Sequence, residues 1–186
     1  MPVSHSSDNP AESARRKDPR GSYRSVHQKT ASHNFLLPLL ETHYPVDAVV
    51  LMLGTNDCKT VYNASSHVIG KGMEVLLKQV KNYDASLPVL LLSPIYLGEG
   101  VWEKEYDPEF NRASVEVSRE LKTEYGRLAK LYGYEFLAAS DVAEPSSADR
   151  EHMDEEGHRA LADAVWKKLQ AMAATEDEIA TEISRQ

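Results

Sequence analysis

Residues 42–57 read THYPVDAVVLMLGTND, and this stretch decides the fold that the rest of the chain has to complete. Its central part, DAVVLML at 47–53, holds five large apolar residues out of seven, two of them adjacent valines. Such a run predicts a strand that is covered on both faces in a parallel sheet, rather than an alternating, half-exposed strand. Gly54-Thr55-Asn56-Asp57 then ends the strand in a turn.

The segments on either side of this strand alternate between helical and extended patterns. Before it, FLLPLLETHY at 35–44 predicts a short helix interrupted by Pro38. After it, the sequence predicts a helix over 64–82, a buried strand from Leu87 that stops at Pro94, a helix over 107–132 with Pro108 in its first turn, a short strand over 134–140, and a last helix capped by Asp154. Strand and helix alternating in this way indicate right-handed βαβ crossovers, and therefore an α/β three-layer sandwich with a parallel sheet.

The two ends of the chain differ in composition from its middle. Residues 1–33 carry six Lys or Arg against three Asp or Glu, and Val3 and Val26 are nearly their only large aliphatic residues. Such a segment can bury little surface, so we expect a polar, flexible arm over 1–33, one domain over 34–173 and an acidic tail over 174–186.

The overall charge excludes several classes of partner. The formal net charge is −8 and the pI is near 5.4, so nucleic acid and anionic membrane would be repelled over most of the surface. No apolar run approaches the roughly 18 residues that cross a bilayer, and the start lacks the apolar region of a secretory signal. With the single cysteine, Cys58, these features predict a cytoplasmic protein that acts on a small molecule.

Candidate site residues follow two of the predicted strands or lie near the last helix. Ligands of parallel sheets bind outside the carboxyl ends of the strands. Gly54 permits a sharp turn there, and Asn56 can aim an amide donor into the crevice, as an oxyanion hole requires. Asp149 and His152 are three residues apart, so the carboxylate can orient the imidazole. Taken singly, Asn56 and Asp57 more often only shape a turn and cap the following segment, and a histidine in a polar loop is more often simply solvated.

A metal site is the alternative for the second group. Asp149, His152, Asp154 and His158 are near one another in sequence, but they lack the helical histidine pair at i and i+4 that zinc proteases use. We therefore expect neither a metal nor any other cofactor. His158 falls inside the predicted last helix, beside Gly157, and is expected to be a surface or packing residue.

In combination, these motifs resemble a known family. A strand that ends in LMLGTND, about 90 further residues, and then D-x-x-H leading into DEEGHRALA resemble the third and fifth sequence blocks of the SGNH/GDSL hydrolases. The similarity is greatest to the arylesterase or acyltransferase-like branch, whose wording H-x-P-x-D-x-V-x-x-M-L-G-T-N-D matches 43–57, and it covers about 34–172. The resemblance implies a flavodoxin-like SGNH hydrolase fold.

The resemblance also implies roles for the candidate residues. His152 would be the general base that activates a serine, Asp149 its orienting acid, and Asn56 an oxyanion donor, with Gly54 shaping the turn. The family reaction is attack of the serine on an ester, formation of an acyl-enzyme, and release to water or to another alcohol. A carboxylic ester hydrolase acting on small acyl or aryl esters is therefore expected.

The family's first block is a strand leading into Gly-Asp-Ser-Leu. This block cannot be identified in the sequence, so the nucleophile is unknown. Gly-Asp-Ser occurs nowhere in the chain. Three interpretations stay open: a truncated and inactive ester hydrolase, an enzyme that uses a serine of the arm (Ser7, Ser13 or Ser22), and a non-catalytic remnant that binds acyl or glycan ligands. Since the family's first strand is central, its loss would make 47–53 an edge, open to homo-oligomer formation or edge-strand pairing.

Overall fold

The structure of the chain is a computed structural model that describes residues 34–184. The expected arm, 1–33, lies outside the described residues. The helices and strands, in chain order, are α1 (Leu36–Thr42), β1 (Val49–Met52), the 3₁₀ helix η3 (Asn56–Cys58), α2 (Ser66–Tyr83), β2 (Val89–Ser93), α3 (Arg112–Tyr132), β3 (Glu135–Ala138), the 3₁₀ helix η4 (Ala139–Asp141) and α4 (Glu155–Ser184). α4 runs through most of the segment that we assigned to an acidic tail.

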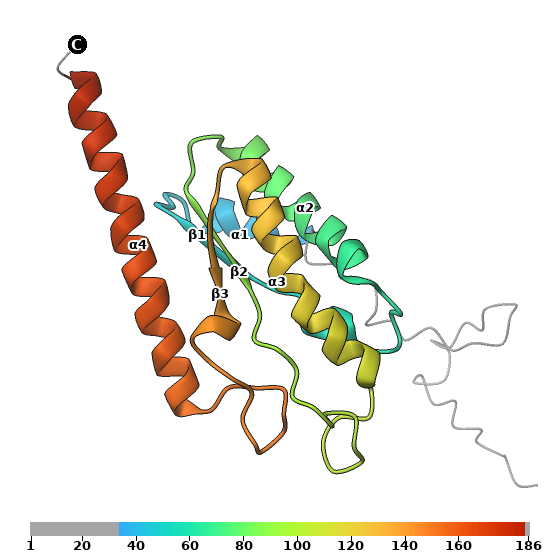
Figure 1. Ribbon diagram of the computed structural model, residues 1–186. Coiled ribbons are helices and arrows are strands. Elements are labelled where there is room, and N and C mark those ends of the chain that lie inside the picture. The colour runs from blue at the N-terminus through green and yellow to red at the C-terminus, as the bar shows by residue number, and fades with distance from the viewer. Residues whose placement is uncertain (1–33, 185–186) are drawn as a thin grey trace, which may run out of the picture.

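The described strands form one parallel sheet in the order β1-β2-β3, so the predicted α/β sandwich is confirmed. Helices α2 and α3 cover one face of the sheet and α4 lies over the other (Figure 1). Alternate residues of β2 face the two layers: Val89 and Leu91 pack with α2 and α3, whereas Leu90 and Leu92 pack on the side of α4. Every residue of β2 is buried, as its apolar run predicts.

The prediction that the DAVVLML strand is covered on both faces is wrong for the described residues. Val49 and Leu51 are buried beneath α1 and α2, but Val50 and Met52 are 43% and 39% exposed. The reason is the position of α4, whose packed residues contact β2 and β3. β1 is also an edge of the described sheet, as the resemblance implied.

Two helices differ from those expected, α3 in its first residue and α1 in its continuity. α3 begins at Arg112 rather than near Asp107, because Asn111 caps it. The side chain of Asn111 accepts a hydrogen bond from the backbone N–H of Ser114 at 2.9 Å, and the hydroxyl oxygen of Ser114 accepts one from the backbone N–H of Asn111 at 3.1 Å, which makes a capping box. α1 is continuous through Pro38, which falls in its first turn, where the backbone N–H needs no partner within the helix.

Candidate active site

The turn after β1 holds a glycine that the surrounding structure requires. Gly54 has φ +129°, which L side chains rarely adopt, and a Cβ there would lie 2.7 Å from the hydroxyl oxygen of Tyr125. The Tyr125 hydroxyl is held in place because it donates a hydrogen bond of 2.9 Å to the carbonyl of Leu53. Tyr125 belongs to α3 and is 1% exposed, so a buried side chain from another layer fixes the start of the turn.

Gly54→Ala is expected to lower the free energy of unfolding by about 2 kcal/mol or more, because it adds backbone strain and a clash with Tyr125. Urea unfolding measures this loss. Gly72→Ala is the matched control, since no atom lies within 4 Å of its Cβ position on α2 and alanine favours helix, so it should stabilise the protein slightly. Equal stability of Gly54→Ala and the unchanged protein would contradict the expectation.

Asn56 opens the 3₁₀ helix that follows this turn. Its side chain is exposed, and its backbone carbonyl accepts from the N–H of Lys59 at 3.2 Å. No hydrogen bond of the Asn56 side-chain amide is found within residues 34–184. The amide therefore stands at the carboxyl end of β1 with its donors uncommitted, which is compatible with the predicted oxyanion role.

Asp149 and His152 form the hydrogen-bonded pair that their spacing predicts. Nδ1 of His152 lies 2.8 Å from Oδ2 of Asp149, while Oδ1 accepts from the backbone N–H groups of Glu151 and His152, each at 2.9 Å. Because the ionised carboxylate can only accept, Nδ1 carries the proton. The His152 side chain is 71% exposed, and no described residue hydrogen-bonds to its Nε2, so within the described residues this nitrogen is open.

The pair shifts both pKa values in the directions that an acid–base pair needs. Burial raises the pKa of Asp149, but the hydrogen bonds from the His152 and Glu151 backbone and from the imidazole outweigh it and bring the pKa to about 2. The hydrogen bond to Asp149 raises the pKa of His152 above its usual 6.5, against a smaller lowering by burial. Asp149 is thus ionised at neutral pH and supports the imidazolium.

Lys59 and Arg150 link this pair to the turn after β1. The ammonium group of Lys59 donates to Asp107 at 3.0 Å and to Glu109 at 2.6 Å, in the segment before α3. The segment that carries Asp149 and His152 reaches the same loop, because the guanidinium carbon of Arg150 lies 4.4 Å from the centre of the Tyr106 ring. The loops that carry Asn56, the segment before α3, and His152 therefore meet at the same end of the sheet, where ligands of parallel sheets bind.

No nucleophile is identified among the described residues. No serine in residues 34–184 hydrogen-bonds to the His152 imidazole. Ser93, at the end of β2, is fully buried and its hydroxyl has no partner, so substrate cannot reach it. Burial raises the pKa of the Cys58 thiol to about 12, which leaves it protonated and unreactive.

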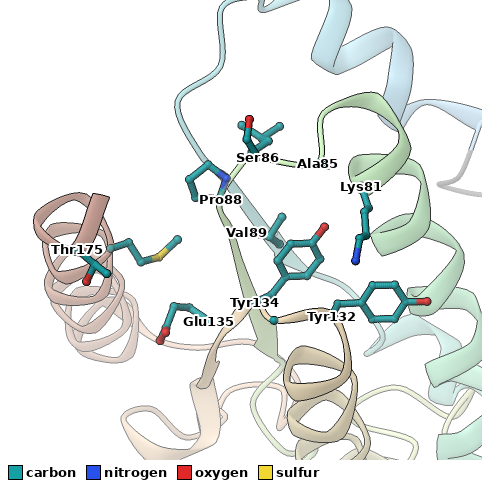
Figure 2. Close-up of a pocket in the computed structure, with 12 residues that line it drawn as sticks. Lys81, Ala85, Ser86, Pro88, Val89, Tyr132, Tyr134, Glu135 and Thr175 are labelled. Atoms are coloured by element: carbon teal, nitrogen blue, oxygen red, sulfur yellow. The ribbon is translucent and has the colours of Figure 1, made fainter. Parts of the chain in front are cut away.

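A pocket of about 300 Å³ lies at the other end of the sheet, between the starts of β2 and β3 and α4 (Figure 2). Two of its polar groups have partners, since Glu135 binds Lys168 at 2.8 Å and the Tyr132 hydroxyl donates to Glu74 at 3.1 Å. The Tyr134 hydroxyl is buried there without a hydrogen-bond partner among the described residues. The pocket is at the amino ends of the strands, away from Asn56 and His152, so it is not the candidate site.

The remaining predicted residues, Asp154 and His158, belong to the start of α4 rather than to the acid–base pair. Asp154 accepts from the N–H of Gly157 at 2.8 Å and so caps α4, and His158 is exposed on that helix, as expected. Within the described residues, no three His, Cys, Asp or Glu side chains gather closely enough to hold a metal ion.

Sequence reasoning missed Tyr125, Lys59 and Arg150. A tyrosine among the aliphatic residues on the buried face of α3 was the available signal for Tyr125, because a buried phenol needs a partner for its hydroxyl. Lys59 and Arg150 gave no local signal, since their partners lie about 50 residues away in sequence.

Solved structures similar to this chain include two esterases. A carbohydrate acetylesterase from Sinorhizobium meliloti is 29% identical, with a TM-score of 0.68, over 75% of this chain and 67% of its own. An aryl esterase from M. smegmatis, in its inhibitor-bound form, is 25% identical, with a TM-score of 0.68, over 84% of this chain and 73% of its own. This similarity agrees with the GTND and D-x-x-H motifs. The chain has the SGNH/GDSL hydrolase fold.

A further crystal structure is 39% identical to this chain, with a TM-score of 0.71, over 75% of this chain and 66% of its own. The chain thus spans about two thirds of the length of the solved structures that it matches. No protein-family model matches the sequence, and no curated protein matches it either. In the described part of the chain, no helix has both the length and the apolar character that a membrane crossing requires.

Proposed function

We propose that this protein is a serine-type ester hydrolase that acts on small acyl or aryl esters through an acyl-enzyme. The observation that carries the proposal is the Asp149–His152 pair, with its proton on Nδ1 and its Nε2 open, at the same end of the sheet as Asn56. Similarity to a carbohydrate acetylesterase and an aryl esterase supports ester chemistry.

In the proposed reaction, His152 Nε2 takes the proton of a serine hydroxyl as its oxygen attacks the ester carbonyl. Asn56 donates to the oxyanion that forms, together with backbone N–H groups of the turn after Gly54. The imidazolium, held by Asp149, then protonates the departing alcohol as the acyl–oxygen bond breaks. Water, deprotonated by His152, releases the acid, and another alcohol in its place would give acyl transfer.

The serine itself lies outside residues 34–184 in this proposal, because no described serine reaches the imidazole. A serine of the arm, or one on a segment that pairs with the open edge of β1, would complete the site. If no serine is delivered, the remaining crevice would bind acyl or glycan ligands without hydrolysing them, which is the second candidate function.

Hydrolysis of p-nitrophenyl acetate, measured beside labelling with a fluorophosphonate probe, tests the proposal. Turnover together with a labelled serine supports the hydrolase, and mass spectrometry of the labelled peptide identifies the nucleophile. Absence of both turnover and label in a folded, monodisperse sample would contradict hydrolysis by this chain and favour the binding function.

Asn56→Ala is expected to lower kcat by about 10²–10³-fold, with little change in KM, because the amide binds the oxyanion more strongly than the ground-state carbonyl. Steady-state kinetics with p-nitrophenyl acetate measure this loss. Asn56→Asp should be slower still, since its carboxylate repels the oxyanion. A kcat of Asn56→Ala within about threefold of the unchanged enzyme would exclude the oxyanion role.

A further inference from the structure

The loop between β2 and α3 is packed as a fixed wall rather than as a free flap. Val101 at its centre is fully buried in the core, and its carbonyl accepts from the N–H of Asp107 at 2.9 Å. The N–H of Leu97, at the start of the loop, donates to the hydroxyl of Ser118 on α3 at 3.0 Å. We refer to residues 97–107 as the wall loop.

Arg150 joins the wall loop to the acid–base pair. Its carbonyl accepts from the N–H of Gly98 at 2.8 Å, and its Nη1 donates to the carbonyl of Glu99 at 2.6 Å. Its guanidinium carbon lies 4.4 Å from the centre of the Tyr106 ring, within the range of a cation–π contact. Its side chain therefore contacts the loop near both ends.

The backbone of Arg150 is held in an unusual conformation. Its φ is +62°, in the left-handed region that favours glycine. The two glycines of the wall loop make this approach possible: a Cβ on Gly98 would lie 2.8 Å from Cβ of Arg150, and one on Gly100 would collide with the guanidinium. Glycine would adopt this φ with less strain than arginine does. The contacts of Arg150 with the wall loop therefore hold its backbone in this conformation.

Backbone hydrogen bonds also join the segment around Arg150 to the acid–base pair. Its N–H donates to the carbonyl of Ser146 at 2.9 Å, and the N–H of Ser146 donates to the carbonyl of His152 at 2.7 Å. Asp149 and His152 lie on either side of Arg150 in this small ring of hydrogen bonds. A change at Arg150 must therefore alter the geometry between the carboxylate and the imidazole.

We propose that Arg150 is a positioning residue, which fixes the Asp149–His152 pair by clamping its loop to the wall loop through Glu99 and Tyr106. Its consequence for catalysis rests on the proposed function. The clamp itself does not, because the hydrogen bond between Asp149 and His152 exists without turnover.

The His152 pKa, measured by NMR titration of the imidazole protons, tests the clamp. The ionisable groups that act on this imidazole are Asp149, Glu151 and Lys59. If Arg150 positions the pair, Arg150→Ala weakens the hydrogen bond to Asp149, and the pKa falls toward 6.5. If Arg150 acted only as a nearby cation, its removal would raise the pKa, so the two roles predict opposite signs.

Arg150→Gly separates the side chain from the backbone, because glycine adopts φ +62° without strain. The proposal expects the pKa to fall in both Arg150→Ala and Arg150→Gly, and to stay unchanged in Arg159→Ala, a control arginine on α4 with an exposed ion pair to Glu155. An unchanged or raised pKa in both Arg150 variants would overturn the proposal. So would a fall in Arg150→Ala alone, which would assign the effect to the backbone. Thermal melts establish that each variant is folded.

The same samples separate failure of the clamp from failure of the hydrolase. A pKa that depends on Arg150, in a protein without esterase turnover, would remove the proposed function and leave the clamp intact. Turnover in a protein whose His152 pKa does not change in the Arg150 variants would remove the clamp and leave the proposed function intact. Where turnover is present, the clamp expects Arg150→Gly to lower kcat more than it raises KM.

Discussion

His152→Ala is expected to lower the kcat for p-nitrophenyl acetate by about 10⁶-fold, to near the background rate, because it removes the proposed acceptor of the nucleophile's proton. The side chain is 71% exposed, so its removal should leave the fold unchanged. Steady-state kinetics and far-UV circular dichroism on the same sample measure the two effects.

His158→Ala is the matched control for this prediction. His158 lies six residues further along the chain, is exposed on α4, and should retain most of the activity. If His158→Ala were inactive and His152→Ala active, the assignment of the general base would be wrong. A fluorophosphonate label that survives in His152→Ala at the full rate would likewise exclude the role of His152 in activating the serine.

Asp149→Asn is expected to lower kcat by about 10⁴-fold while it preserves the loop. The amide oxygen can still accept from the backbone N–H groups of Glu151 and His152, as Oδ1 does now. The amide nitrogen, however, would donate to His152 Nδ1 and move the imidazole proton to Nε2, where it blocks the base. Retained kcat in a folded Asp149→Asn protein would rule out this orienting role.

The pH dependence follows from the same pair. Activity requires neutral His152, whose pKa is raised above 6.5, so the rate should rise with pH and reach half its maximum above 6.5. In Asp149→Asn this midpoint should move down toward 6.5. The pair also contributes to stability in a limited window. The His152 part is present below 6.5 and is lost as pH rises through the raised pKa; the Asp149 part is present above 3.8 and is lost as pH falls toward about 2.

The layers of the domain could be predicted because each depends on local pattern. The unbroken apolar run of β2 indicated burial on both faces, and the structure confirms it. The same argument failed for β1, because the exposure of Val50 and Met52 depends on where α4 packs, which no pattern within the strand records. The start of α3 was misplaced because the cap at Asn111 was stronger than the proline signal at Pro108.

The sequence by itself determined the Asp149–His152 pair, because two residues three positions apart meet through a single turn of chain, and it placed Gly54 and Asn56 at the end of a strand. The tertiary structure alone decided the meeting of these two loops, the Tyr125 hydroxyl beneath Gly54, and the clamp of Arg150 on the wall loop. Tyr125 and Leu53 are 72 residues apart and Arg150 and Glu99 are 51 apart, so these contacts form only when the crossovers bring the strand ends together. Spacing along the chain fixes short-range hydrogen bonds, whereas long-range ones depend on how the layers pack.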